Sequence, residues 1–242
     1  MSDTQSSSST APAESPKPMP FAIMRNAHEA LRASILLQEQ KLDSGDDASF
    51  REEWQTFQRA IAIHMAMEDD TMFALLDEVG GGAITTAMLP AEHLEDAILA
   101  RAVNDVLDSG DPVALRAAWT AWKDDHLNHL KHEEDVMMPL TMKTGPTPEA
   151  RARIMHDRVL VPSEVLPGFD WYVGWVVYML SRYGSAGHTA AVATRGFAWG
   201  LQHACSPAQW NRLRPVVERN TTAEIWAELT TKFGLGGAGA IV

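Results

Sequence analysis

The chain has 242 residues, of which 45% are hydrophobic and 21% are charged, as is usual for a globular protein. Its formal net charge of −12 argues against nucleic acid or an anionic membrane surface as a partner. The single cysteine, Cys205, excludes an intramolecular disulfide and a metal cage of thiolates, and fits a cytoplasmic protein. Any metal must therefore be held by His, Asp and Glu side chains.

The N-terminal residues 1–19 are rich in Ser, Thr, Ala and Pro, and we expect them to form a disordered tail. They contain no apolar core and do not resemble a signal peptide. The following residues, 20–145, have the apolar periodicity of helices separated by Gly- and Asp-rich turns. The predicted helices span residues 21–42, 47–79, 90–109 and 112–143.

Residues 146–242 are predicted to form a C-terminal helical extension, which Pro and Gly divide into short helices. Its most apolar run, residues 171–180, is much shorter than the roughly 20 residues that span a membrane, so we expect a buried helix. Three histidines of this region, His156, His188 and His203, are interpreted as ordinary helix residues.

An internal repeat at an offset of 65 residues relates two parts of the predicted bundle. It places Arg51 over Arg116 and Trp54 over Trp119. Each half also contributes one lone His on a first helix and a His-x-x-x-Glu motif on a second helix. The candidate ligands are His28, His64 and Glu68 in the first half, and His93, His129 and Glu133 in the second half. A two-fold arrangement of the two helix pairs would give a four-helix bundle.

The residue types of this repeat indicate a metal site. Residues four apart share one helical face and lie about 6 Å apart along the axis. Four imidazoles and two carboxylates in a bundle core would be costly without a cation. Two divalent metal ions remove that cost, as they do in other helical bundles. This donor set suits iron, with manganese or zinc as alternatives.

Two further histidines of the fourth predicted helix have no histidine counterpart in the repeat. His126 corresponds to Ile61, and His132 corresponds to Met67. We therefore place both outside the ligand set, behind the ligands or at the surface. The sequence leaves open whether His126, His132 or Glu134 contributes to the site.

Taken together, these residues resemble the hemerythrin-like, or HHE cation-binding, family over about residues 21–143. The resemblance implies an up-down four-helix bundle around an oxo- or hydroxo-bridged, non-haem di-iron centre. By the same resemblance Glu68 and Glu133 match the bridging carboxylates. The terminal ligands would be His28, His64, His93 and His129.

One departure from the oxygen carriers of this family bears on function. The carriers have a second His four residues after the one on the third helix, where this chain has Ala97. They also have an Asp where this chain has Glu134. The remaining set of four His and two carboxylates is similar to the sensing and redox members of the family.

The leading hypothesis is thus a di-iron protein that reacts with or senses dioxygen, peroxide or nitric oxide, without nucleic acid or a membrane as partner. One alternative is a di-metal redox enzyme whose C-terminal helices form its own substrate pocket. Another is a protein that binds a partner in a metal-dependent way. No catalytic residue or organic cofactor site is assigned, because the sequence contains no nucleophile–base constellation and no phosphate-binding Gly motif.

Overall fold

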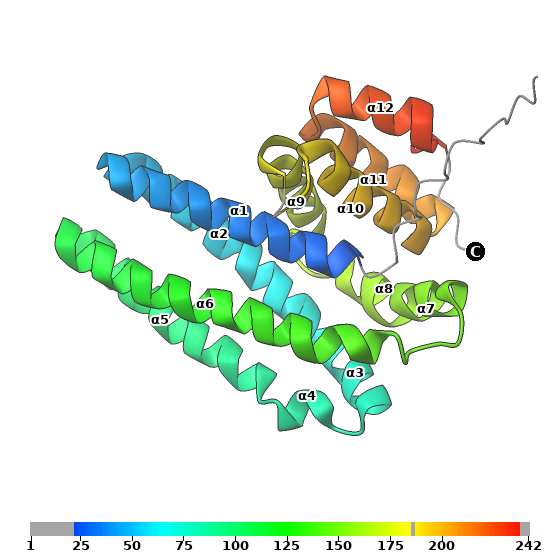
Figure 1. The fold of residues 1–242 in the computed structure, drawn as a ribbon, viewed down its shortest axis with the longest axis horizontal. Coiled ribbons are helices and arrows are strands. Elements are labelled where there is room, and N and C mark those ends of the chain that lie inside the picture. The colour runs from blue at the N-terminus through cyan, green and yellow to red at the C-terminus, as the bar shows by residue number, and fades with distance from the viewer. Residues whose placement is uncertain (1–21, 185–186, 238–242) are drawn as a thin grey trace, which may run out of the picture.

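The structure is a computed structural model that describes residues 22–184 and 187–237 (Figure 1). Within these ranges the regular elements are helices and no β-strand occurs, so the predicted all-α helical-bundle fold is confirmed. Four long helices lie alongside one another (Figure 1). They are α1 (Ala22–Ser44), α2 (Asp47–Met67), α5 (Leu89–Ser109) and α6 (Pro112–Thr141). The predicted tail, residues 1–19, lies outside the described ranges.

The turn between the first two long helices explains where α1 ends and where α2 begins. Gly45 has a φ of 70°, a left-handed conformation that glycine adopts without a steric penalty. The side chain of Asp46 then accepts a hydrogen bond from the backbone N–H of Ser49 and caps α2. The same kind of cap, from Asp111, precedes α6, which begins at Pro112 as the sequence predicts.

The helix predicted over residues 47–79 runs without a break but contains an irregularity. α2 passes into a π-helical turn, η1 (Glu68–Met72), and then into α3 (Phe73–Gly80). Such turns occur frequently at functional sites, and this one begins at a candidate ligand. A short helix that the sequence does not predict, α4 (Ala83–Thr86), follows α3. It is held by Asp77, whose carboxylate accepts hydrogen bonds from two backbone N–H groups at this helix.

Two ion pairs between the halves of the bundle reflect the 65-residue repeat. Arg51 at the start of α2 binds Asp108 at the end of α5, with Nη1 and Oδ1 3.1 Å apart. Arg116 near the start of α6 binds Asp43 at the end of α1, with Nη2 and Oδ1 2.5 Å apart. Asp43 and Asp108 are also 65 positions apart. The halves therefore exchange equivalent contacts, as a two-fold relation between the helix pairs requires.

Buried tryptophans fill the bundle core near the starts of α2 and α6. The rings of Trp54 and Trp122 meet edge to face, with centroids 4.7 Å apart. Trp54 donates its indole N–H to Asn104, and Trp119 donates its own to Gln38. Truncation of such a side chain to Ala typically costs about 3–5 kcal/mol, so this cluster is a main anchor of the bundle.

Shorter helices from the C-terminal region lie on one side of the bundle (Figure 1). They are α7 (Pro148–Met155), η2 (His156–Leu160), α8 (Val161–Ser163), α9 (Phe169–Tyr183), α10 (Ala190–Ala204), α11 (Pro207–Asn220) and α12 (Ala223–Phe233). Both α9 and α10 contact α1, and α9 also contacts α2. The apolar run 171–180 lies in α9, which is largely buried, as predicted. None of the described helices is both long and apolar enough to cross a lipid bilayer.

The three histidines of this region lie apart from the candidate ligands. His156 begins η2 and bonds through Nε2 to the side chain of Gln209. His203 lies in α10 and donates from Nδ1 to a backbone carbonyl of the same helix. The predicted helical placement of His188 is wrong. Gly184 is the C-cap of α9 at a φ of 72°, and His188 lies outside a helix, before the start of α10 at Ala190.

Candidate metal centre

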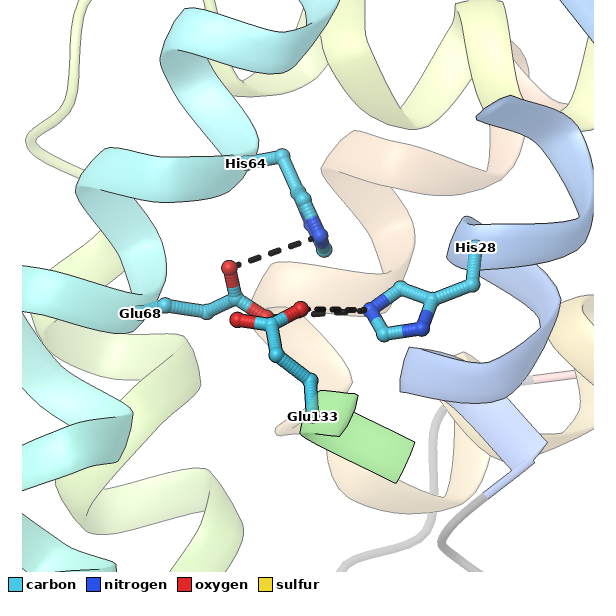
Figure 2. A group of neighbouring side chains, drawn as sticks. All are labelled: His28, His64, Glu68 and Glu133. Atoms are coloured by element: carbon cyan, nitrogen blue, oxygen red, sulfur yellow. Dashed lines mark ion pairs between the residues drawn. The ribbon is translucent and has the colours of Figure 1, made fainter. Parts of the chain in front are cut away.

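The six candidate ligands meet in the core of the bundle. Each has at most 6% of its surface exposed. His28 comes from α1, His64 from α2, Glu68 from η1, His93 from α5, and His129 and Glu133 from α6. Figure 2 shows four of these side chains, from three segments of the bundle, pointing toward one another. The repeat thus brings residues from both halves to one place.

Glu133 lies between two groups of imidazoles. On one side its Oε2 is 3.5 Å from Nε2 of His28. On the other side its Oε1 is 3.4 Å from Nε2 of His93 and 3.3 Å from Nε2 of His129. The donor atoms form two compact groups, each able to surround one ion, and Glu133 belongs to both. Glu133 is therefore placed to bridge two ions.

Glu68 also reaches imidazoles of both halves. Its Oε1 is 3.8 Å from Nε2 of His28, and its Oε2 is 3.4 Å from Nε2 of His64. The same Oε2 lies 3.7 Å from Nε2 of His93. Figure 2 shows the carboxylates of Glu68 and Glu133 both directed toward His28, with His64 beside Glu68.

The atoms that face the middle of the cluster have no hydrogen-bond partner among the described residues. They are Nε2 of all four imidazoles and both oxygens of both glutamates. Leaving one buried polar atom unpaired costs about 1–3 kcal/mol, and more when the group is charged. Separations of 3.3–3.8 Å exceed the usual N–H···O distance of about 2.7–3.2 Å. They suit two atoms that bind a common cation at about 2.0–2.2 Å each, so the donor set fits a metal.

The outward nitrogen, Nδ1, of the two lone histidines is held by a carboxylate from the opposite half. Nδ1 of His28 lies 3.0 Å from Glu134, and Nδ1 of His93 lies 3.0 Å from Asp69. Asp69 and Glu134 directly follow the two site glutamates and are 65 positions apart. A proton on Nδ1 leaves the lone pair of Nε2 free for a metal, so these carboxylates fix the ring and its tautomer.

His129 is held by a carboxylate that also reaches the surface. Its Nδ1 lies 2.9 Å from Oε2 of Glu92, and the other oxygen of Glu92 lies 2.7 Å from Nδ1 of His132. The side chain of His132 is 41% exposed. His132 therefore lies outside the cluster, where the sequence analysis placed it.

His64 has a different kind of partner. Its Nδ1 lies 3.1 Å from the phenol oxygen of Tyr172, which belongs to α9. In the first half the position equivalent to Glu92, 65 residues earlier, is Ala27, which offers no carboxylate to His64. The C-terminal region supplies the missing hydrogen-bond partner.

His126 is fully buried and shares one feature with the candidate ligands. Its Nδ1 lies 2.8 Å from Asp96, which is also buried, while its Nε2 has no partner among the described residues. Its ring stacks on Trp122, and its centroid lies 6.0 Å from that of His129. His126 lies outside both compact groups of donor atoms.

In a comparison with protein families, residues 19–141 match the model described as the hemerythrin HHE cation binding domain. The match covers 123 of the 242 residues, just over half of the chain. The chain belongs to the hemerythrin HHE family. Cation binding in this family agrees with a His and Glu cluster that could hold a metal. Comparisons with curated proteins and with solved structures gave no match.

The acid–base properties of this hemerythrin HHE domain show that its core attracts positive charge. Burial lowers the pKa of His28, but the carboxylates of Glu134, Glu68 and Glu133 outweigh it and raise this pKa to about 9. The pKa of His93 is likewise raised to about 9 against the effect of burial, by Glu133 and other carboxylates. Without a metal, protons take the place of the cation.

The sequence did not single out Asp69, Glu92 or Tyr172 of the HHE site, and it left the contribution of Glu134 open. The repeat carried a signal for Asp69 and Glu134, because both follow the site glutamates at the same offset. Glu92 directly precedes a candidate ligand and carried only a weak signal. Tyr172 lies outside the repeat, and no sequence pattern connected it to the site.

Proposed function

We propose that the HHE domain of this chain holds two iron ions as a non-haem di-iron centre that reacts with or senses dioxygen, peroxide or nitric oxide. The observation that carries the proposal is the set of eight buried, unpartnered nitrogen and oxygen atoms from six side chains. Their division into two groups that share Glu133 favours two ions over one.

The donor set favours iron among the divalent metals, because imidazoles and carboxylates surround the site and no thiolate is present. When bound, iron supplies one-electron redox chemistry and coordination positions for a small molecule. Eight donor atoms divided between two ions leave such positions open. Open coordination positions favour a centre that reacts with small oxidants over one that only stores the metal.

Four residues that hydrogen-bond to the ligand imidazoles hold these rings in position. Asp69, Glu92, Glu134 and Tyr172 each engage Nδ1 of one imidazole, so the four rings keep their orientation. Partners of this kind typically change metal affinity by about 10–100-fold when they are removed. The role of these residues is to position the ligands.

An anaerobic titration of metal-free protein with ferrous ion tests the proposal. The wild type should saturate at about two ions per chain, as two-metal sites require. Glu133→Gln replaces one oxygen of the carboxylate that both groups share and should reduce binding to one ion or fewer. Glu52→Gln, on an exposed side chain of α2, is the matched control and should bind two ions. Saturation of the wild type at one ion, or no saturation, would reject a two-metal centre.

A further inference from the structure

The two halves of the centre have different surroundings, although the repeat gives them equivalent ligands. In the second half, Glu92 bonds to both His129 and the exposed His132, so hydrogen-bonded polar side chains connect this side to the surface. In the first half, Ala27 occupies the position equivalent to Glu92. The space beyond Ala27 is covered by helices of the C-terminal region.

A cavity of about 60 Å³ lies on this first side. Its wall combines apolar side chains of α1 and η1 with apolar side chains of η2, α9 and α10. The polar residues of the wall are His64, Glu68 and Tyr172. Two of these are candidate ligands, so the cavity borders the metal centre itself.

The size of the cavity limits what it can hold. A water molecule needs roughly 10–15 Å³ of such space, and an apolar cavity that binds benzene measures about 150 Å³. A space of about 60 Å³ therefore admits a molecule of a few heavy atoms and excludes an organic substrate of ordinary size. Against an apolar wall an ion would lose its hydration, and hydrogen peroxide, though neutral, would lose most of its hydrogen bonds to water; both losses are costly.

Tyr172 provides a hydrogen-bond donor at the edge of this cavity. When Nε2 of His64 binds a metal, Nδ1 carries the proton and donates it to the phenol oxygen of Tyr172. The phenol O–H then has no other acceptor among the described residues. Its proton is free to bond to a molecule in the cavity.

We propose that the C-terminal helices make this cavity a selective chamber for a neutral diatomic gas at the metal centre, with Tyr172 as the hydrogen-bond donor to that gas. The inference rests on the proposed function, since the gas must meet a loaded centre. It goes further in two respects. First, the cavity is expected to favour dioxygen and nitric oxide over peroxide. Second, α9 and α10, which lie beyond the matched family domain, gain a role as walls of this cavity.

A pair of variants on one helix tests the chamber. Ala204→Leu fills the cavity from α10, and Ala198→Leu adds the same group to a buried position of α10 that does not line it. Both are loaded with iron, reduced, and mixed with nitric oxide under anaerobic conditions. Ala204→Leu should bind nitric oxide at least tenfold more slowly than wild type, with unchanged iron content, while Ala198→Leu should retain the wild-type rate. A wild-type rate in fully loaded Ala204→Leu would overturn the inference.

Xenon provides a readout that does not depend on the metal. Xenon binds dry apolar cavities, so its NMR resonance should shift with wild type and with Ala198→Leu, and the shift should be lost with Ala204→Leu. Equal shifts in all three proteins would contradict the assigned cavity. If the wild type binds xenon but no iron, the proposed function fails and the cavity remains.

Wild-type protein alone tests the preference for a neutral gas, which keeps the inference falsifiable if a variant does not fold. Reduced, iron-loaded protein should be oxidised at least tenfold faster by dioxygen than by an equal concentration of hydrogen peroxide. The reverse order would overturn the selectivity.

Tyr172→Phe tests the donor. It should retain two iron ions, shift the N–O stretching frequency of bound nitric oxide, and speed its release roughly threefold to tenfold, the equivalent of one hydrogen bond. An unchanged stretch and release rate would exclude Tyr172 as the donor.

Discussion

The phenol oxygen of Tyr172 lies 3.1 Å from Nδ1 of His64, although the two residues are 108 positions apart in the chain. His64 belongs to the HHE domain, and Tyr172 belongs to α9, beyond the matched residues 19–141. The C-terminal region thus contacts a candidate ligand directly. A change in α9 is therefore expected to reach the metal centre as well as the fold.

The ligand assignment predicts which histidines of α6 matter most. His129→Ala should cut metal content sharply, because Nε2 of His129 faces the cluster and has no hydrogen-bond partner among the described residues. His132→Ala should change metal content little, because its side chain is 41% exposed and bonds outward to Glu92. Metal analysis of the purified variants checks both outcomes.

The metal content of His126→Ala, compared with that of His129→Ala, is a stricter test of the ligand assignment on α6. His126 lies outside both compact groups of donor atoms, so its replacement should cause only a partial loss of metal. If His126→Ala abolished metal binding while His129→Ala retained it, the assignment of ligands on α6 would be wrong.

The sequence predicted the bundle and the candidate ligands for one physical reason. A helix converts a spacing of four residues into a shared face, and the repeat identified which face turns inward. The structure brings His28 and His93 together with both His-x-x-x-Glu motifs, as that reasoning expected. The boundaries of the long helices followed from Gly and Asp residues with known capping preferences.

Other parts could not be predicted, because they depend on tertiary packing. Nothing in the local sequence of α9 indicates that Tyr172 bonds to Nδ1 of His64, where Ala27 offers no carboxylate. The short helix α4 depends on the carboxylate of Asp77, whose role appears only once α3 has formed. The sequence placed His126 either behind the ligands or at the surface, and only the packed core shows that it is fully buried against Asp96.

Replacing the carboxylates that bond to Nδ1 of His28 and His93 should change the affinity for metal but not the number of ions bound. Asp69→Asn and Glu134→Gln weaken the bonds to Nδ1 of His93 and His28. Each should lower metal affinity by about 10–100-fold while two ions still bind at saturation. Competition with a chelator of known affinity measures the change. Unchanged affinity in both variants would show that these carboxylates do not support the ligands.

The raised pKa values of His28 and His93 predict how pH affects the metal-free protein. Both are about 9 in the folded state, against 6.5 for an ordinary His. Bound protons therefore stabilise the folded form fully below pH 6.5, and this contribution is lost as pH rises through about 9. The free energy of unfolding of metal-free protein should fall between pH 7 and pH 9.5 in urea titrations.

Metal-loaded protein provides the control for this pH effect. Its imidazoles hold a cation in place of protons, so its stability should change much less over the same range. A metal-free protein whose stability is equal at pH 7 and pH 9.5 would contradict the charge arrangement described for the site.

Removal of the metal should lower the stability of the bundle. A ligand that binds only the folded state adds about 4 kcal/mol when its concentration is about 1,000 times its dissociation constant. For a chain of this size that corresponds to a decrease in Tm of roughly 8–16 °C on chelation. Re-addition of ferrous ion should restore the original Tm. An identical Tm before and after complete chelation would count against a site in the core.

The most direct test of the central claim is the metal content of the 242-residue protein, purified after growth with iron. Two iron ions per chain are expected, with near-ultraviolet absorption from the oxidised centre that disappears on reduction and returns in air. Eight buried atoms without partners make this outcome specific, because they have no other source of compensation among the described residues. Protein that is folded, free of metal and unable to take up iron when it is supplied would contradict the account.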